Sequence, residues 1–478
     1  MNPSWMAVYG SLPAPLKNVA ASLRGWSLRR WRYGPDTERL VEEALEREHW
    51  APPRWKVWQE ERIAVLLRRA AKRVPYYREQ WAERRRAGDR ASVENLQNWP
   101  ILTKETLRSR NADFVADDRD RGSMFHEHTS GTTGLPLNLW SSRETVRNWY
   151  ALFEARVRQW NGVTRHDRWA ILGGQLVTPA SQRRPPFWVW NAGLHQLYMS
   201  SYHISPETAI AYIDALRRFR IRYVLGYASS LFSLAHLARE AGLEAPTLSL
   251  AISNAEPLYA HQRETIGAVF GCPVRDTYGM AEIASAASEC ASGRLHLWPE
   301  AGFLEIRDPA TGGPAAAGEI GKMTCTTLLN ADMPLVRYEV GDLGALAEDG
   351  QRCGCGRTLP ELQEITGRLD DVIVTPEGRR VGRLDTVFKV DMRIREAQVV
   401  QETQDEVRVL VVPAEGFGPS DVESIRRRLQ DRLGPRIRIS IHEVAGIPRT
   451  SAGKFRAVIS RVGSAGSERP SRAAGGRS

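Results

Sequence analysis

A regular alternation of predicted helices and strands in the middle of the chain limits the folds that this sequence can adopt. Alternating elements of this kind are typical of a parallel sheet whose strands are joined by crossover helices. The sequence therefore predicts an α/β fold. In chain order, the expected elements are a strand at Trp169–Leu172, a helix at Pro206–Phe219, a strand at Tyr223–Leu225, a helix at Ser229–Ala241, a strand at Leu248–Ile252, a helix at Tyr259–Phe270 and a strand at Val274–Asp276.

Two loops directly after these strands carry polar and small residues. They are Asn254–Pro257 and Thr277–Glu282. In open parallel sheets, ligands bind beyond the carboxyl ends of the strands, so both loops are expected to face one cleft.

A third loop, His128–Pro136, packs hydroxyls and two glycines into nine residues. Exposed N–H groups and hydroxyls in such a turn can hold a polyphosphate. It is not a P-loop, because no lysine follows the second glycine. The alternative interpretation is a polar surface loop.

The rest of the sequence suggests further parts. Residues 1–100 are expected to be helical and packed on the main body, and eight of the fifteen tryptophans lie there. These tryptophans are interpreted as packing anchors, with an interfacial or partner-binding arm as the alternative. Residues 101–369 form the expected core, which includes a β-rich subdomain at Leu295–Leu346. Residues 370–462 are expected to form a small, mobile α+β domain, and the Gly/Ser/Arg-rich residues 463–478 to be disordered.

Composition excludes several classes of protein. The net charge of +10 is spread along the chain and interleaved with acids, which is not typical of a nucleic-acid groove. No apolar run reaches 18 residues and no signal peptide is evident, so no transmembrane segment is expected. Five cysteines in 478 residues fit a reducing compartment, and the cytoplasm is the predicted location.

Six motifs in order carry a family resemblance. HTSGTTGLP, SNAEPL, DTYGMAE, RYEVGDLG, TGRLDD and PRTSAGK resemble the motifs of the adenylate-forming ligases. The AEP triplet, the SEC after DTYGMAE, and CGCGR are most similar to the phenylacetate–CoA ligase group and its CapK-like branch. The resemblance covers nearly the whole chain. It implies a large N-terminal domain with mainly parallel sheets and a small mobile C-terminal lid.

The resemblance also assigns roles to individual residues. It implies that the β- and γ-phosphates lie against Thr129, Ser130, Gly131, Thr132, Thr133 and Gly134, and that adenine lies between Ala255, Glu256 and Pro257 on one side and Asp276, Thr277 and Tyr278 on the other. It implies Glu282 as the Mg²⁺ ligand, Asp342 as the ribose acceptor, Arg368 against ribose or phosphate, Asp370 as the hinge, and Lys454 at the carboxylate and α-phosphate.

Structural alternatives remain for three of these residues. Glu256 could be an acid at a helix start, Asp342 a turn cap, and Lys454 an exposed loop lysine. Leu135 stands where many of these ligases have a lysine, which removes one charge from the phosphate loop.

The implied reaction joins a small-molecule carboxylic acid to AMP from ATP and then to the thiol of CoA. A carrier-protein thiol or an amine could replace CoA, the reaction could stop at AMP transfer, or the chain could be a catalytically weak scaffold. Phe187–Trp190, with Tyr198 and Tyr227, is expected to line the acyl pocket, which would favour an aryl or arylalkyl acid.

Four residues form a possible metal site outside these motifs. Cys290 and His296 lie close in sequence, and Cys353 and Cys355 flank one glycine. Three thiolates and an imidazole can complete a tetrahedral Zn²⁺ site. The alternative is reduced, inert thiols beside a strand histidine.

Overall fold

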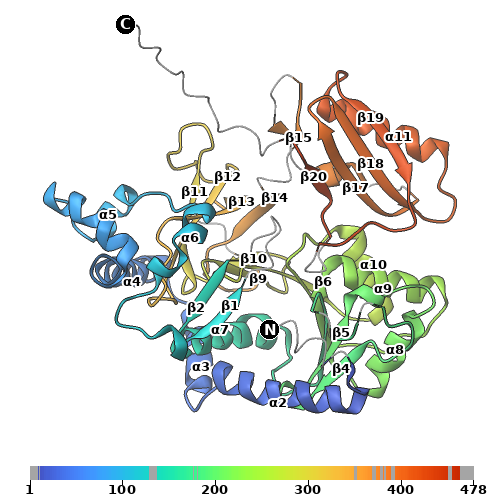
Figure 1. The fold of residues 1–478 in the computed structure, drawn as a ribbon, viewed down its shortest axis with the longest axis horizontal. Helices are drawn as coiled ribbons and strands as arrows, with labels where there is room; N and C mark the ends of the chain where they lie inside the picture. The colour runs from blue at the N-terminus through green and yellow to red at the C-terminus, as the bar shows by residue number, and fades with distance from the viewer. Residues whose placement is uncertain are drawn as a thin grey trace, which may run out of the picture. The chain divides into compact units, whose positions relative to one another are not determined.

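The computed structural model divides the chain into two compact units, Met1–Ile365 with Thr450–Lys454, and Thr366–Arg449 with Phe455–Ser478 (Figure 1). The described residues are 9, 11–128, 137–175, 177–179, 181–348, 353–368, 373–376, 380–381, 384–388, 393–450 and 455–462. No helix among them is long and apolar enough to span a membrane.

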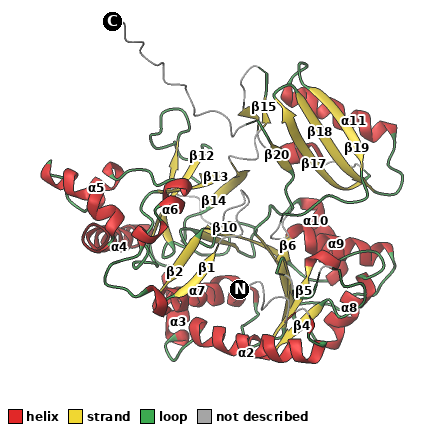
Figure 2. Ribbon diagram, in the orientation of Figure 1, coloured by secondary structure: helices red, strands yellow, loops and turns green. Residues whose placement is uncertain are grey.

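An eight-stranded sheet is the centre of the first unit (Figure 2). Its strand order is β10-β9-β8-β7-β6-β3-β5-β4. The five central strands, β8, β7, β6, β3 and β5, run parallel, whereas β4, β9 and β10 each run antiparallel to a neighbour. The bounds are β3 Trp169–Gly173, β4 Trp188–Asn191, β5 Gln196–Ser200, β6 Tyr223–Tyr227, β7 Leu250–Asn254, β8 Val274–Gly279, β9 Ala286–Glu289 and β10 Leu295–Leu297.

Helices cover both faces of this sheet, as its parallel strands require. Ala170, Val224 and Ala251 share one apolar core with helices α8 to α10. Their neighbours Trp169, Tyr223 and Leu250 face the opposite core, which contains residues of α3 and α7. The bounds are α3 Thr37–Arg47, α7 Arg143–Phe153, α8 Ala209–Arg218, α9 Ala228–Glu240 and α10 Ala260–Phe270.

A four-stranded sheet, in the order β11-β12-β13-β14, forms the predicted β-rich region. It shares a core with the buried face of α4 and with the hairpin of β1 and β2. The bounds are β1 Phe125–His128, β2 Asn138–Ser141, β11 Gly302–Arg307, β12 Gly321–Thr327, β13 Tyr338–Leu346, β14 Leu362–Arg368, α4 Pro52–Arg73, α5 Pro75–Arg86 and α6 Lys104–Ser109.

Helix α2, Ala14–Arg32, lies against β4 and α7 and buries mainly small or polar residues (Figure 1). Asn18 Oδ1 accepts from Trp190 N, and Ser22 Oγ accepts from Ala192 N. Gly25 is buried where a Cβ would overlap the Asn191 side chain. The close fit of the helix to the sheet therefore depends on the absence of a side chain at position 25.

The second unit contains a sheet in the order β19-β18-β17-β20 and the helix α11, Pro419–Leu433. Strands β17 and β18 are antiparallel to each other. Strand β19 pairs in parallel with β18, and β20 pairs in parallel with β17. Ile425, Leu429 and Leu433 of α11 join its apolar core. The bounds are β15 Ile373–Val374, β16 Arg380–Val381, β17 Ile394–Thr403, β18 Glu406–Pro413, β19 Arg438–Glu443 and β20 Val458–Ser460.

These elements confirm the predicted α/β fold class. The sequence of Arg143–Trp160 has the pattern of one continuous helix, but regular α-helix ends at Phe153 and a π-helical turn occupies Glu154–Arg158. Its side chains at 154, 156 and 158 are buried. Glu154 pairs with Arg158 within this turn, and Arg156 pairs with Glu300, which precedes β11.

Candidate active site

The loops after β7 and β8 lie side by side, as the sequence predicts. Asn254 and Thr277 pair in register at the ends of the two strands. Thr277 Oγ1 donates to Ser253 O at 2.8 Å, and Ala255 turns the chain with φ of 60°. Both loops therefore meet at the carboxyl edge of the sheet, where open α/β sheets bind ligands.

A cavity of about 770 Å³ extends from these loops to α2 and α7. Aromatic side chains dominate its α7 wall, where Trp149, Tyr150 and Phe153 lie. The described residues that line it include three arginines, Arg24, Arg32 and Arg158, but neither Asp nor Glu. A pocket with apolar walls and an excess of guanidinium groups suits an apolar organic anion.

Arg158 is the buried cation of this cavity, and the sequence analysis did not identify it. Its side chain donates to Glu154 Oε2 at 2.9 Å and to Tyr223 Oη at 2.8 Å. Its guanidinium also lies over the rings of Phe153 and Trp169. The available signal was charged residues at 154, 156 and 158 inside an apolar helical run.

Two predicted nucleotide-binding residues from different sheets are hydrogen-bonded to each other. Tyr278 Oη, from β8, donates to Asp342 Oδ2, from β13, at 2.8 Å. Burial and the neighbouring Asp342 carboxylate raise the pKa of Tyr278 well above its usual value, so the phenol stays protonated. The contact brings the predicted adenine and ribose positions to one place beside the cavity.

Asp276 of β8, which was also predicted to contact adenine, lies beside a second carboxylate, that of Glu289. Its backbone N–H donates to Glu289 Oε2 at 2.7 Å, and both terminal nitrogens of Arg263 bind the same Glu289 carboxylate. Burial and the charge of Glu289 raise the pKa of Asp276 to about 7. This carboxyl therefore ionises at a higher pH than an ordinary aspartate.

Glu256 and Glu282 both have structural partners. Glu256 Oε2 accepts from the backbone N–H of Ser229 at 2.9 Å, in the first turn of α9. Glu282 is buried, accepts from Tyr338 Oη at 3.1 Å, and lies 3.5 Å from Lys104 Nζ. The first contact matches the helix-start alternative for Glu256. The Glu282 carboxylate is already paired with a cation, the ammonium of Lys104.

Several predicted site residues lie outside the described part of the chain. They are the phosphate-loop residues Thr129–Gly134, the hinge residue Asp370 and the lysine Lys454. Arg368 is the last residue of β14, and its side chain is also outside the described part.

The predicted acyl-pocket aromatics are only partly correct. Of that set, Val189 and Tyr198 are among the residues that line the cavity. Phe187, Trp188 and Trp190 instead pack into the core beside α8. Alternate residues of a strand point to opposite faces, so β4 cannot turn Val189 and its tryptophan neighbours to one side. Trp149, from α7, supplies an aromatic wall that was not predicted.

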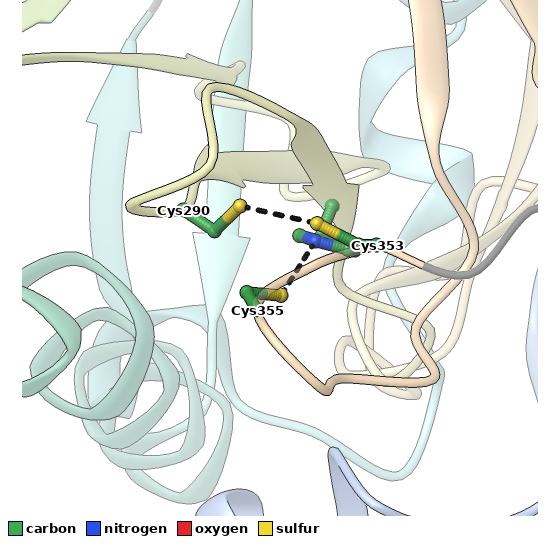
Figure 3. Close-up of side chains that lie close together, drawn as sticks. Cys290, Cys353 and Cys355 are labelled. Carbon is green, nitrogen blue, oxygen red and sulfur yellow. Dashed lines mark hydrogen bonds between the residues drawn. The ribbon is translucent and has the colours of Figure 1, made fainter.

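The four predicted metal ligands converge from distant parts of the first unit. Cys290 follows β9, His296 lies in β10, and Cys353 and Cys355 lie between β13 and β14. Their ligand atoms all lie within 4.8 Å of one another. Figure 3 shows the side chains of Cys290, Cys353 and Cys355 directed toward a common centre.

The distances in this cluster suit a tetrahedral ion. Cys290 Sγ and Cys353 Sγ are 3.6 Å apart, and Cys355 Sγ is 3.3 Å from His296 Nε2. Zn–S bonds of about 2.3 Å in a tetrahedron separate two sulfurs by about 3.8 Å. Nδ1 of the buried His296 lies 3.2 Å from Leu359 O and donates to it, so Nε2 is free of hydrogen and faces the thiols.

Known proteins with similar sequences match both units of the chain. Residues 373–461 match the CapK C-terminal domain. The chain is 25% identical to Protein CapK of Staphylococcus aureus over 460 residues, which covers 95% of this chain and 99% of that protein. It is 26% identical to the phenylacetate-coenzyme A ligase of Thermus thermophilus over 472 residues, which covers 89% and 99%.

A solved structure shows the same fold. The 2-hydroxyisobutyryl-CoA ligase, crystallised in the postadenylation state with R3-HIB-AMP, matches with a TM-score of 0.64 at 23% identity, covering 84% of this chain and 88% of that one. The chain is thus a homologue of CapK and the phenylacetate-coenzyme A ligases, with the fold of the adenylate-forming CoA ligases.

Proposed function

We propose that this protein is an ATP-dependent carboxylate ligase that forms an acyl-adenylate and then an acyl thioester with CoA. In the first step the carboxylate attacks the α-phosphate of ATP and pyrophosphate leaves. In the second step the thiol attacks the acyl carbon and AMP leaves. A carboxylate is a poor electrophile, and the AMP leaving group makes thiol attack possible.

One observation carries the proposal: a single cavity reaches both the loops of the nucleotide motifs and an apolar, aromatic interior. Thr277 and Tyr278 line one part of it, and Trp149 and Phe153 another. An acid held there has its carboxylate near the nucleotide and its apolar body in the aromatic part. We therefore propose an aryl or arylalkyl acid as substrate, in line with the names of the phenylacetate-coenzyme A ligase relatives.

The nucleotide roles implied by the family motifs are part of this proposal. Glu282 would hold Mg²⁺, which would supply positive charge to the ATP phosphates, and Lys104 would then leave that carboxylate. Asp342 would accept from the ribose in addition to Tyr278. The domain limits at 101–369 and 370–462 and a cytoplasmic location, which fits five free cysteines, belong to the proposal as well.

A pyrophosphate-release screen over aromatic, aliphatic, sugar and amino acids tests the activity. Release that depends on an aryl acid, followed by thioester formation with free CoA, is the expected result. Adenylation without a CoA product would favour a carrier-protein thiol, an amine acceptor or simple AMP transfer. If no acid triggers release, the ligase proposal is wrong and a scaffold remains.

Lys454 is proposed to serve the adenylation step, where its ammonium neutralises charge that builds up on the α-phosphate. Lys454→Ala should lower carboxylate-dependent pyrophosphate release about 10²-fold or more. Thioester formation from a synthetic acyl-adenylate should be largely retained. Asp370→Pro, which fixes φ at the proposed hinge, should instead impair the thiol step more. Equal damage to both steps by Lys454→Ala in a folded protein would contradict this role.

We also propose a structural Zn²⁺ at Cys290, His296, Cys353 and Cys355. It would tie the β9–β10 hairpin to the loop between β13 and β14. Protein purified without a metal-affinity tag should contain about one zinc per chain. Cys353→Ser should lose the metal and melt at a lower temperature, while Cys272→Ser, outside the cluster, should keep it. A metal-free protein whose melting is unchanged by Cys353→Ser would show inert thiols.

A further inference from the structure

Four large apolar side chains of helix α2 are exposed, whereas a helix that only packs on a core buries such side chains. Leu16, Val19, Leu23 and Trp26 follow a spacing of three or four residues and so share one face. Their exposed fractions are 51%, 55%, 59% and 50%. They make up half of the eight large hydrophobic residues that are exposed in the described chain.

The other sides of α2 are already occupied. Asn18, Ser22 and Gly25 contact β4 and the turn after it. Ala20 and Leu28 line the cavity. The face formed by Leu16, Val19, Leu23 and Trp26, termed here the outer stripe, therefore contributes little to either the fold or the cavity.

Charge indicates what covers the outer stripe. Residues 1–35 contain neither Asp nor Glu, and α2 itself carries Lys17, Arg24, Arg29, Arg30 and Arg32. Arg24, Arg29 and Arg30 are exposed. A helix that combines an apolar face containing tryptophan with unopposed arginines is typical of segments that lie in a membrane interface.

Area argues against a second copy of the chain. Four half-exposed side chains present on the order of 400 Å² of apolar surface, whereas a stable dimer buries about 800 Å² on each partner. Two identical basic helices would also repel each other. A lipid surface has neither restriction, because anionic headgroups neutralise the arginines while the apolar side chains enter the boundary with the acyl chains.

We propose that α2 docks this protein on an anionic lipid bilayer, with the outer stripe inserted at the interface and Arg29 and Arg30 against headgroups. This binding is independent of the proposed ligase activity. Of the N-terminal tryptophans it uses Trp26, which is exposed, whereas Trp55, Trp81 and Trp99 are buried in the protein.

Co-sedimentation of the full chain with vesicles tests the docking. Vesicles of phosphatidylglycerol and phosphatidylcholine should bind the protein, and pure phosphatidylcholine or high salt should weaken binding about tenfold or more. Leu16→Ser with Leu23→Ser should also reduce binding at least about tenfold. The matched control is Val57→Ser with Val65→Ser, two valines of α4 that are 55% and 54% exposed, and it should bind normally.

Three results would overturn the proposal. They are no binding to anionic vesicles, equal loss in both double variants, and light scattering that shows a dimer dissociated by Leu16→Ser with Leu23→Ser. Circular dichroism and acid-dependent pyrophosphate release in vesicle-free buffer should match the wild type in both double variants. Loss of docking can therefore be distinguished from misfolding and from failure of the ligase proposal.

Discussion

Helices α2 and α4 both lie in the N-terminal region, but α4 turns its large apolar side chains toward the protein and α2 exposes several of its own. Helix α4 buries Ile63, Leu66 and Leu67 in the core shared with the four-stranded sheet. Helix α2 buries Lys17, Ser22 and Gly25 and exposes Leu16 and Leu23. Apolar periodicity predicts that both are helices, but it does not say whether the apolar side meets the protein or something outside it.

The difference follows from what each helix has to contact. Helix α4 covers an apolar sheet face, so burial of its large side chains contributes to folding. Helix α2 packs close to the turn around Gly193, where a Cβ would overlap the backbone of Gly25 and Trp26. Only small residues fit such a contact, and the large ones are left on the far side.

Truncation of one leucine in each helix should give the largest difference between α2 and α4. Leu67→Ala removes a fully buried side chain and should destabilise the protein by about 2–5 kcal/mol. Leu23→Ala removes an exposed side chain and should change stability by no more than about 0.5 kcal/mol. Urea denaturation in the absence of lipid measures both. Similar losses would mean that α2 is buried against protein after all.

A smaller effect is expected at Asp276, where environment again overrides residue type. Its folded pKa of about 7 lies above its ordinary value of 3.8, so the folded chain holds a proton that the unfolded chain has released. This contribution to stability is complete below about pH 4 and is lost as the pH rises through 7. The wild type should therefore lose stability between pH 5 and pH 8.

The variant Asp276→Asn cannot titrate there, so its melting temperature should fall less than that of the wild type over the same range. Asp308→Asn is the control, because backbone and side-chain hydrogen bonds from Thr311 lower the pKa of that exposed carboxylate. Its titration is therefore complete below pH 5. Parallel pH profiles for the wild type and Asp276→Asn would show that the carboxyl is already ionised at pH 5.

The sequence was sufficient for the sheet and for the meeting of two loops at its carboxyl edge. Strands β3, β6, β7 and β8 and the helices between them have strong local patterns, and the loops after β7 and β8 lie side by side as expected. The ligand atoms of Cys290 and Cys353 also approach each other as the zinc hypothesis requires.

What the sequence did not indicate depends on contacts between distant segments. Trp188 and Trp190 were placed in the acyl pocket, but their orientation is set by the pairing of β4 with β5. Arg158 lies in the π-helical turn, where it pairs with Glu154 of the same turn, and it also donates to Tyr223 of the distant strand β6. The contribution of α2 to the cavity wall cannot be read from its own periodicity.

The cavity between α2 and the β8 loop is proposed to hold the acid that is activated. Ala21 lines this cavity from α2, whereas Val65 of α4 points into solvent. Aryl acid-dependent pyrophosphate release by the wild type, Ala21→Trp and Val65→Trp therefore tests the claim directly. If the acid binds there, Ala21→Trp should raise the KM for the acid at least about tenfold and leave the KM for ATP unchanged, whereas Val65→Trp should match the wild type. Unchanged kinetics in Ala21→Trp, or no acid-dependent release by the wild type, would contradict it.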